Sequence, residues 1–315
     1  MININKLILL TFVLILSSVF VMAAPSKLMI TDLDISIEDA SGDTKTDKNL
    51  EDGETIRHEI SPESKIEFKI ELKNNYTSSE GLEIEDITVD VFIRGIDDDD
   101  DLEESSSDFN LRANKDKTVT FDFSVPLKVE EDVYSIDLEV EGDDENGTTH
   151  TLSWELYIEL EKENHLLKLD KAVFEESSLQ CSGSTYLDLS IVNIGTSDED
   201  VELYIQNNDL NINERMEFSL SEDPFDSDSS FKERVLIDVP DDIGSGGYPL
   251  RLRIQYDDET IERNLLLKIV CSKESEVQQT EVKEQAEVKD TPKAEVAGFG
   301  VDTFSTTAVM EPVIV

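Results

Sequence analysis

The residues best suited to bind an ion lie in the acidic run 96–104, which reads IDDDDDLEE. Calcium takes roughly six to eight oxygen ligands, and clustered carboxylates can supply them. No segment fits the loop of an EF-hand, however, and consecutive aspartates typically form a solvated, self-repelling loop. Two interpretations therefore stay open: a solvated loop, or a site for a divalent cation such as calcium. Segment 226–228 supports a cation site more weakly, and no other cofactor is expected.

Two cysteines, Cys181 and Cys271, are the only ones in the chain, and both lie in its second half. A disulfide persists in a protein that is exported to an oxidising compartment. Cys271 continues the apolar alternation of residues 265–269, and Cys181 precedes a strand of the same parity, so both are expected on the core side. We therefore expect a Cys181–Cys271 disulfide. The alternative is two free buried thiols that pack as small hydrophobic groups.

Two segments match the N-x-[ST] sequence of N-glycosylation, with Asn75 and Asn146 as the acceptor residues. Both fall in predicted loops, where a glycan is tolerated. The chain contains 15 Asn residues, and about two such matches are then expected by chance. Glycosylation and coincidence therefore both remain open.

The sequence contains no motif of a known catalytic or zinc site. His58, His150 and His165 lie in separate segments, and none has a Cys, Asp or Glu at the spacing of a metal-binding motif. The G-x-S-x-G turn of hydrolases and the glycine-rich loops that bind nucleotides are also missing. A carboxylate pair for glycoside hydrolysis needs a cleft, which small β-domains rarely offer. We expect that the protein is not an enzyme.

Charge narrows the choice of partners. The chain has 73 Asp and Glu against 27 Lys and Arg, a formal net charge of −46. Such a surface repels nucleic acid and anionic lipid, so neither is expected as a partner. The 315 residues and 38% hydrophobic content allow packed cores in about two domains.

Apolar residues alternate with polar ones in most of the chain, which predicts half-buried β-strands. The segment Ser64–Lys73, SKIEFKIELK, is the clearest example, and the pattern recurs at 87–91, 119–123, 134–140, 152–158, 187–191, 201–205, 235–239 and 248–254. Helical periodicity is absent before residue 272. Strands at this spacing, separated by Asp, Ser, Gly and Asn clusters, indicate an all-β protein built of antiparallel sandwiches.

The chain also repeats itself. Val125–Glu145 reads VPLKVEEDVYSIDLEVEGDDE, and Val239–Glu259 reads VPDDIGSGGYPLRLRIQYDDE. The two segments align with each other without a gap. Segment 65–75 similarly resembles 185–195, with Asn74 opposite Asn193 when the two segments are shifted by one residue. The repeat predicts two modules, residues 24–162 and residues 163–272. Tyr134 and Tyr248 then occupy the position of the tyrosine corner of Ig-like sandwiches, although ordinary core aromatics explain them equally well.

The two ends differ from the modules. Lys6, an apolar run and small residues before Ala23 predict a signal peptide over residues 1–23, with an uncleaved membrane anchor as the alternative. The apolar run is short for a membrane span of about 20 residues. Residues 273–315 are predicted to form a disordered, low-complexity tail, because Glu-Val recurs in a highly charged sequence. The apolar last stretch could instead add a strand to a sheet edge.

These features resemble a known group of surface proteins. The succession N-x-G, V-x-L-x-I, a strand ending in VP, and G-x-Y-x-L is similar to the Ig-like modules, of the CARDB and NEW3 types, in archaeal and bacterial surface proteins. With the signal peptide and polar tail, the chain resembles archaeal S-layer proteins. The resemblance covers about residues 25–272 and implies no catalytic residues. Such proteins often end in a transmembrane helix, which this sequence lacks.

The expected function follows from this resemblance. We predict a secreted or cell-surface structural or adhesion protein, in which two tandem Ig-like modules act as spacers. Its expected partners are other cell-envelope proteins or further copies of itself. The alternative is a carbohydrate-binding or accessory module of a secreted hydrolase system, which would need a groove of exposed Tyr or Trp side chains. The single Trp, Trp154, lies at a core-facing position in its predicted strand.

Overall fold

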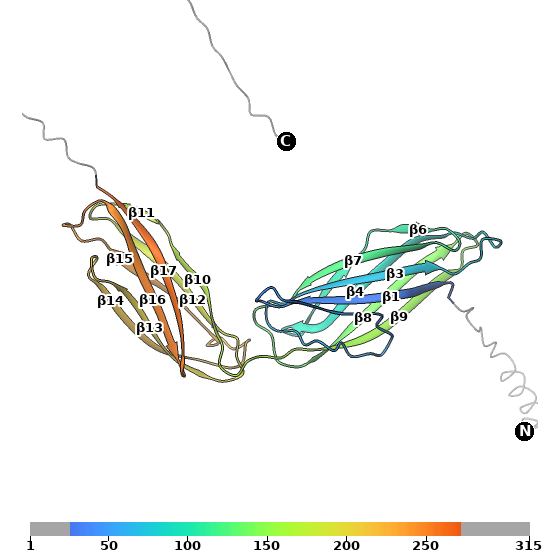
Figure 1. Cartoon of the computed structure of the whole chain (residues 1–315), viewed down its shortest axis with the longest axis horizontal. Coiled ribbons are helices and arrows are strands. Elements are labelled where there is room, and N and C mark those ends of the chain that lie inside the picture. The colour runs from blue at the N-terminus through green and yellow to red at the C-terminus, as the bar shows by residue number, and fades with distance from the viewer. Residues whose placement is uncertain (1–25, 272–315) are drawn as a thin grey trace, which may run out of the picture. The chain divides into compact units, whose positions relative to one another are not determined.

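The computed structural model describes residues 26–271, and all of their regular secondary structure is β-strand. These strands form two sandwiches of antiparallel sheets (Figure 1), which confirms the all-β fold class. The predicted signal peptide, residues 1–23, and the predicted tail, residues 273–315, lie outside the described residues.

The first sandwich contains two sheets. One has the strand order β2-β1-β3-β7, and the other has the order β5-β4-β8-β9, with β6 also paired to β4. The strands are β1 (Leu28–Glu38), β2 (Thr44–Asp47), β3 (Lys65–Asn74), β4 (Ile84–Asp97), β5 (Asp100–Ser105), β6 (Phe109–Leu111), β7 (Asp116–Ser124), β8 (Val133–Asp144) and β9 (Thr149–Glu159).

The second sandwich pairs a three-stranded sheet, β10-β12-β15, with a five-stranded sheet, β11-β17-β16-β13-β14. Its pairings are antiparallel except that of β11 with β17, which is parallel. The strands are β10 (Leu167–Phe174), β11 (Ser178–Gln180), β12 (Ser184–Asn193), β13 (Glu199–Asn207), β14 (Ile212–Leu220), β15 (Ser230–Asp238), β16 (Gly246–Tyr256) and β17 (Glu259–Val270).

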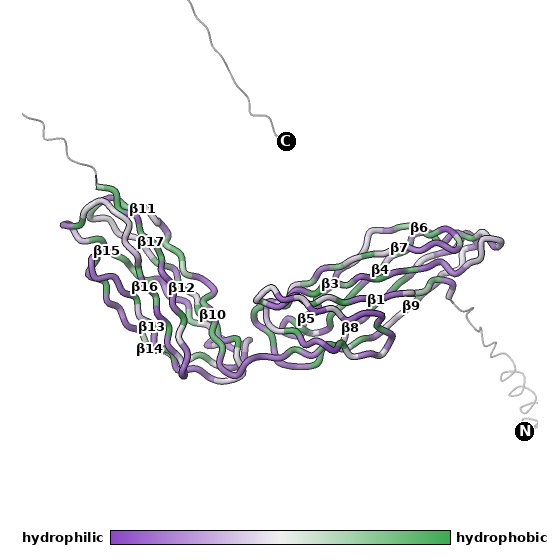
Figure 2. Tube along the Cα trace, viewed as in Figure 1, coloured by the Kyte–Doolittle hydropathy of each residue, from purple (hydrophilic) through white to green (hydrophobic). Residues whose placement is uncertain are grey.

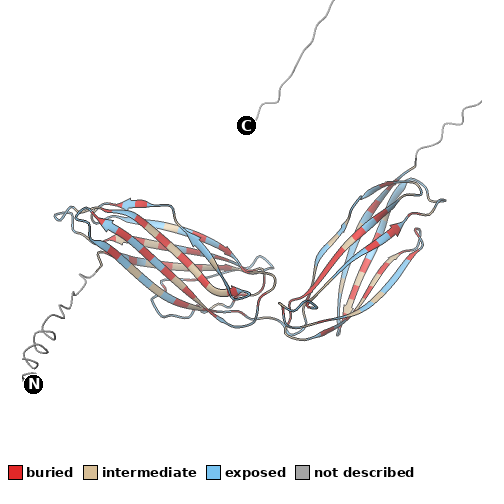
Figure 3. Cartoon of the chain, turned by 180° about the vertical axis from the view of Figure 1, so that it is seen from behind, coloured by how far each residue is buried: buried red, intermediate tan, exposed pale blue. Residues whose placement is uncertain are grey.

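Alternation along the strands builds both cores. In β3 the side chains of Ile66, Phe68, Ile70 and Leu72 are buried, while the lysines and glutamates between them face outward. Figures 2 and 3 show this alternation of hydropathy and of burial along the strands of both sandwiches. Burial of each such side chain stabilises the fold by about 1.5–3 kcal/mol. One hydrophobic cluster spans Leu28 to Leu160, and a separate one spans Leu167 to Ile269.

The two sandwiches share their register. Leu28 of β1 pairs with Asn74 of β3, and Leu167 of β10 pairs with Asn193 of β12. Each first strand carries a β-bulge at the same place, between Ile30 and Asp32 in the first sandwich and between Leu169 and Lys171 in the second. The two modules that the sequence repeat predicts therefore have the same strand pairing at this end.

A buried asparagine holds the same turn in both sandwiches. The Asn74 side chain is fully buried, and its amide donates to the carbonyl oxygens of Leu82 (3.0 Å) and Leu111 (2.8 Å). Its Oδ1 accepts a hydrogen bond from the backbone N–H of Tyr76 (2.9 Å). The side chain thus substitutes for backbone partners that the turn lacks.

Asn193 repeats each of these bonds. Its amide donates to the carbonyl oxygens of Ser197 (2.7 Å) and Ser221 (3.1 Å), and its Oδ1 accepts from the N–H of Gly195 (2.9 Å). Asn193 is also fully buried. The alignment of Asn74 with Asn193 in the sequence is therefore a correspondence of structural role.

The tyrosine corner is present twice. The Tyr134 hydroxyl donates to the carbonyl oxygen of Glu130 (2.9 Å), and the Tyr248 hydroxyl donates to that of Gly244 (2.8 Å). In both cases the acceptor lies four residues upstream, in the loop that leads into the strand. Of the two interpretations that the sequence allowed, the structure supports the corner.

Candidate functional site

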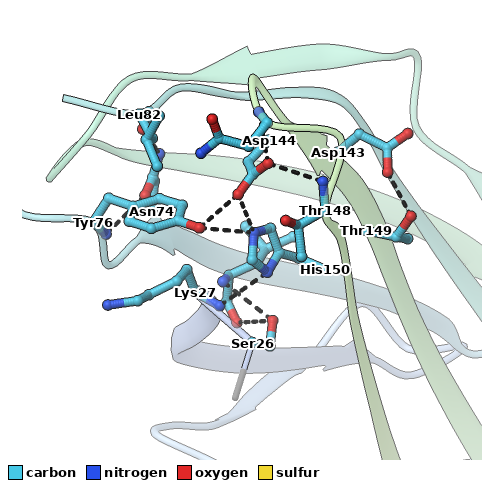
Figure 4. A network of polar contacts seen from close by, with 12 residues as sticks. Ser26, Lys27, Asn74, Tyr76, Leu82, Asp143, Asp144, Thr148, Thr149 and His150 are labelled. Atoms are coloured by element: carbon cyan, nitrogen blue, oxygen red, sulfur yellow. Dashed lines mark hydrogen bonds and ion pairs between the residues drawn. The ribbon is translucent and has the colours of Figure 1, made fainter. Parts of the chain in front are cut away.

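A buried polar network lies where the β8–β9 hairpin meets the loop after β3. Tyr76, Asp144 and His150 point toward one another there (Figure 4). The Tyr76 hydroxyl donates to Asp144 Oδ2 at 2.6 Å, and His150 Nε2 lies 3.5 Å from the same oxygen. Asp144 Oδ1 accepts from the backbone N–H groups of Asn146 and Thr148, both at 2.9 Å. One oxygen of this carboxylate is thus bound by the backbone of the turn, and the other by Tyr76 from the loop after β3.

His150 is held in one tautomer by its neighbours. The backbone N–H of Lys27 donates to His150 Nδ1 at 3.3 Å, so this nitrogen acts as the acceptor. The ring proton is then on Nε2, which faces Asp144 and the Tyr76 oxygen at 3.4 Å. The side chains of His150 and Asp144 are only 4% and 2% exposed.

The network shifts two pKa values in opposite directions. The hydrogen bond from Tyr76, helped by the backbone N–H groups of Thr148 and Asn146, lowers the pKa of Asp144 to about 2. The same bond to Asp144 raises the pKa of Tyr76 to about 12. Asp144 therefore stays ionised and Tyr76 stays protonated across the whole neutral range.

A carboxylate beside an imidazole also occurs in hydrolytic triads, where the imidazole faces a nucleophile. Here the imidazole contacts a backbone N–H, a carboxylate and a phenol, as Figure 4 shows. A general base must be within reach of the proton that it abstracts from a substrate. Here Asp144 and His150 are buried, Tyr76 is half-buried, and the three side chains are bonded to one another. The arrangement joins the start of β1, the loop after β3 and the β8–β9 turn, and its chemistry is that of a structural clamp.

Each of the other two histidines also pairs with a buried carboxylate. His58 Nδ1 lies 3.1 Å from Asp47 Oδ2, and His165 Nδ1 lies 2.8 Å from Glu199 Oε1. The Asp47 and Glu199 side chains are almost completely buried. The hydrogen bond to Glu199 raises the pKa of His165. Sequence reasoning missed all three pairs, because they join different strands or loops and follow no spacing rule.

These pairs do not extend into a metal site. A structural zinc ion needs about four ligands. Within residues 26–271, no group of three or more His, Cys, Asp and Glu side chains is arranged to hold a metal ion. That finding also covers the acidic run 96–104 and segment 226–228, so neither candidate for a cation site gains support.

The acidic run instead forms a β-hairpin. β4 ends at Asp97 and β5 begins at Asp100, so Asp98 and Asp99 form a two-residue turn with φ values of 53° and 66°. Such turns require positive φ, which aspartate tolerates better than most residues. The run is therefore a tight turn between two paired strands, a hairpin that neither interpretation of the sequence included.

Arg94 neutralises part of this hairpin. Its Nη1 lies 2.7 Å from Asp101 Oδ2, and its Nε lies 2.7 Å from Asp137 Oδ2. Asp101 Oδ1 accepts from the N–H of Gly95 at 2.8 Å. The bond from Arg94 lowers the pKa of Asp101, so this carboxylate already has its counter-charge.

The predicted disulfide is present between Cys181 and Cys271, whose Cα atoms are 5.0 Å apart. The parallel ladder of β11 with β17 pairs Gln180 with Val270. Cys181 directly follows Gln180, and Cys271 directly follows Val270, so the disulfide continues the register of that ladder. Cys181 precedes β12, the strand predicted at 187–191, and it directly follows the short strand β11, which was not predicted.

The two glycosylation sequences lie on either side of the polar network. Asn75 directly precedes Tyr76, and Asn146 lies in the turn whose backbone binds Asp144. Both asparagines are exposed. The fold thus brings these two segments to one end of the first sandwich, and their glycosylation stays a prediction.

The carbohydrate-binding alternative gains no support from two surface hollows that contain aromatic side chains. Trp154 is half-buried and packs against the first core. It is the only aromatic side chain in the lining of a surface hollow of about 430 Å³ beside Leu50. Another hollow, of about 680 Å³, contains Phe218 and the buried Tyr256 among acidic residues. Neither offers the exposed aromatic platform that this function needs.

Comparisons with known proteins leave the function open. A scan against models of known protein families and a search of curated proteins both find no match. Among solved structures, the chain is similar to the C-terminal domain of wzt (TM-score 0.27, 12% identity, covering 44% of this chain and 75% of that one). It is also similar to dimeric latent PorU from Porphyromonas gingivalis (TM-score 0.26, 13% identity, covering 81% of this chain and 21% of that one). A third similar structure is CBD12 from CALX1.2 (TM-score 0.23, 11% identity, covering 62% of this chain and 77% of that one). At this level they indicate neither a shared function nor a shared ligand.

Residues 26–271 contain no helix that is long and apolar enough to cross a membrane.

Proposed function

We propose that this protein is a non-enzymatic structural or adhesion component of the cell surface, similar to archaeal S-layer proteins, in which two Ig-like sandwiches act as spacer modules. The observation that carries the proposal is the duplicated framework. Asn74 and Tyr134 in the first sandwich have the same bonding roles as Asn193 and Tyr248 in the second. Repetition of one rigid module extends a chain without adding a reaction centre.

Burial of the polar groups supports a structural role. In the first sandwich, the carboxylate, imidazole and phenol that resemble catalytic groups are bonded to one another, and the carboxylate and imidazole are buried. A spacer benefits from such internal bonds because they hold turns and termini against the sandwich. A catalyst instead needs reacting atoms at a site that a substrate can enter.

The disulfide supports export. Structural disulfides persist in oxidising compartments and are rare in the reducing cytosol. With the predicted signal peptide, Cys181–Cys271 favours a secreted or surface location. The acidic composition restricts partners to basic or cation-bridged surfaces, which include other envelope proteins and further copies of the chain.

Cell fractionation tests the proposal. We expect the protein in the envelope or the medium, beginning at Ala24 by intact mass and with both cysteines oxidised. Full-length protein in the cytosol, with two thiols that react with a maleimide under denaturing conditions, would contradict it. A cytosolic control protein in the same fractions excludes leakage by lysis.

A further inference from the structure

The outer face of the sheet β10-β12-β15 is unusual for this chain because it exposes large apolar side chains. Val173, Tyr186 and Leu236 are 48%, 39% and 49% exposed. They are three of the seven large hydrophobic residues that are exposed within residues 26–271. Tyr186 and Leu236 are directly opposite each other on β12 and β15. The three side chains therefore form one patch and are not scattered.

Basic side chains surround this patch. Lys171, Lys232 and Arg234 lie on the same outer face, and the Arg234 guanidinium stacks 4.2 Å from the centre of the Tyr186 ring. Two carboxylates pair with them: Asp188 lies 2.9 Å from Lys171 Nζ and 3.6 Å from Arg234 Nε, and Glu175 also pairs with Arg234. Three cations thus gather on one small sheet face of a chain whose net charge is −46.

An unsatisfied hydroxyl lies beside these cations. Ser190 is only 4% exposed, and its Oγ has no hydrogen-bond partner within residues 26–271. It lines a shallow surface hollow of about 480 Å³ together with Lys171, Asp188, Lys232 and Arg234. A buried polar group without a partner is costly. An acceptor on a docked surface, such as a carboxylate oxygen, would satisfy it.

The same face of the first sandwich has the opposite character. Because Asn74 corresponds to Asn193, the strand registers place Glu67 at the position of Tyr186, and Asp122 at the position of Leu236. The corresponding outward positions of β1, β3 and β7 carry Asp32, Asp34, Glu67, Glu71 and Asp122. The basic residues on this side of β3 are Lys69, between the two glutamates, and Lys65 and Lys73 toward the strand ends. The first sandwich thus presents a strongly acidic face where the second presents a basic and apolar one.

We propose that these two faces dock in trans: the basic–apolar face (Lys171, Val173, Tyr186, Lys232, Arg234 and Leu236) of one copy against the acidic face (Asp32, Asp34, Glu67, Glu71 and Asp122) of a second copy. Charge complementarity selects this occupant, because a chain with a net charge of −46 otherwise repels copies of itself. The lysines and arginine lie opposite carboxylates, and the stems of these side chains cover Tyr186 and Leu236.

The contact uses different surfaces on the two molecules. A heterologous contact of this kind leaves one free face at each end, so further copies can add. The inference rests on the self-association included in the proposed function and names the surfaces that would produce it. It also explains why the two modules, alike in framework, differ on this one face.

Sedimentation velocity of the purified, disulfide-bonded mature chain tests the pairing over a range of protein concentrations at physiological salt. We expect concentration-dependent association of the wild type. Lys171→Glu/Lys232→Glu should weaken association by at least about tenfold, because like charges then face each other. Glu67→Lys/Asp122→Lys should weaken it similarly, although this variant lowers the overall negative charge.

A mixture of the two variants provides the decisive measurement. Each variant alone should stay monomeric, whereas an equimolar mixture should associate at least as tightly as the wild type, because the charges are complementary again. The control Glu139→Lys/Glu141→Lys adds the same charge to exposed positions of β8, outside both faces, and should not reproduce the loss of association.

Three results would overturn the pairing: no self-association of the wild type, unchanged association of Lys171→Glu/Lys232→Glu, or a mixture that stays monomeric. Near-ultraviolet circular dichroism of each variant confirms that the sandwiches stay folded. The cellular location found by fractionation does not depend on the residues of these two faces. A surface protein that fails to pair would therefore overturn this inference alone, and a cytosolic protein would overturn the proposed function.

Discussion

In the first sandwich a hydrogen-bonded network, Tyr76–Asp144–His150, holds the β8–β9 turn, whereas in the second sandwich a covalent bond, Cys181–Cys271, holds the end of β17. The two sandwiches share the register of β1 with β3 and of β10 with β12, the buried asparagine and the tyrosine corner. The features that both modules share hold the common framework. The polar network and the disulfide each stabilise a segment that is specific to one module. The comparison therefore predicts which substitutions act equally in the two modules and which act in only one.

Removal of the disulfide should have the largest effect, and only on the second sandwich. The bond spans 90 residues, and closure of a loop of that length stabilises by about 4–5 kcal/mol in the chain-entropy model, as an upper figure. Cys181→Ser/Cys271→Ser should lower the Tm of the second sandwich. Trp154, the only tryptophan, lies in the first sandwich. Its fluorescence melt should stay unchanged while the circular dichroism melt gains an earlier transition.

Reductant added to the wild type is the matched control, and it should reproduce the early transition without any substitution. Simultaneous loss of the Trp154 signal would mean that the two sandwiches unfold as one unit. In that case the reinforcement would not be confined to the module that carries it.

Substitution of the two asparagines should come next, with equal effects in both modules. Asn74→Ala and Asn193→Ala each leave two buried carbonyl oxygens and one N–H group without their partner. We expect a loss of about 3 kcal/mol in each case, because an unsatisfied buried group costs about 1–3 kcal/mol. Only Asn74→Ala should shift the Trp154 melt. A loss in one module but not in the other would contradict the equivalence of the two turns.

The polar network predicts a pH dependence of the stability of the first sandwich. Asp144 has a pKa of about 2 in the folded chain, below the usual 3.8, so its ionised form stabilises the fold above about pH 4. This contribution is lost as the pH falls toward 2. Tyr76 has a pKa raised to about 12, so its protonated form stabilises below about pH 10 and the contribution is lost as the pH rises toward 12.

Asp144→Asn and Tyr76→Phe separate the network from other titrating groups. The difference in Tm between the wild type and Asp144→Asn, followed by Trp154 fluorescence, should be greatest near neutral pH and shrink between about pH 4 and pH 2. Tyr76→Phe should reduce the dependence of the Tm on both acid and alkaline pH. Part of the alkaline dependence should remain, because burial also raises the pKa of Tyr134 to about 12. A difference that is constant from pH 7 to pH 2 would show that the Tyr76–Asp144 bond does not form.

The sequence predicts what local alternation and repetition encode, and it fails where distant segments meet. The alternation in β3 and β8 predicts strands, and the parity of Cys271 predicts a core-facing thiol, because side chains alternate with a period of two in any strand. The aligned Asn74 and Asn193 show their shared role once the bonds are known. These features depend on only a few neighbouring residues.

Very short strands and contacts between residues far apart in the sequence could not be predicted, because they depend on tertiary contacts. β11 is three residues long and pairs in parallel with β17, and in β14 the charged Glu214 interrupts the apolar alternation. His165 meets Glu199 across 34 positions of sequence, so no spacing rule could join them. The composition of the acidic run is typical of a solvated loop, but β4 and β5 pair on either side of its turn and form a hairpin.

The tyrosine corners should give the smallest effect and test the equivalence of the modules most finely. Tyr134→Phe and Tyr248→Phe each remove one hydrogen bond to a loop carbonyl and keep the ring in place. One such bond contributes about 1 kcal/mol, and a loss of this size should lower the Tm of the affected sandwich by about 4–8 °C. Tyr134→Phe should shift the Trp154 melt, and Tyr248→Phe should not. Because Tyr134 is more deeply buried than Tyr248, its loss should be the greater of the two, and the opposite order would show that the loop, and not the core, determines the strength of the corner.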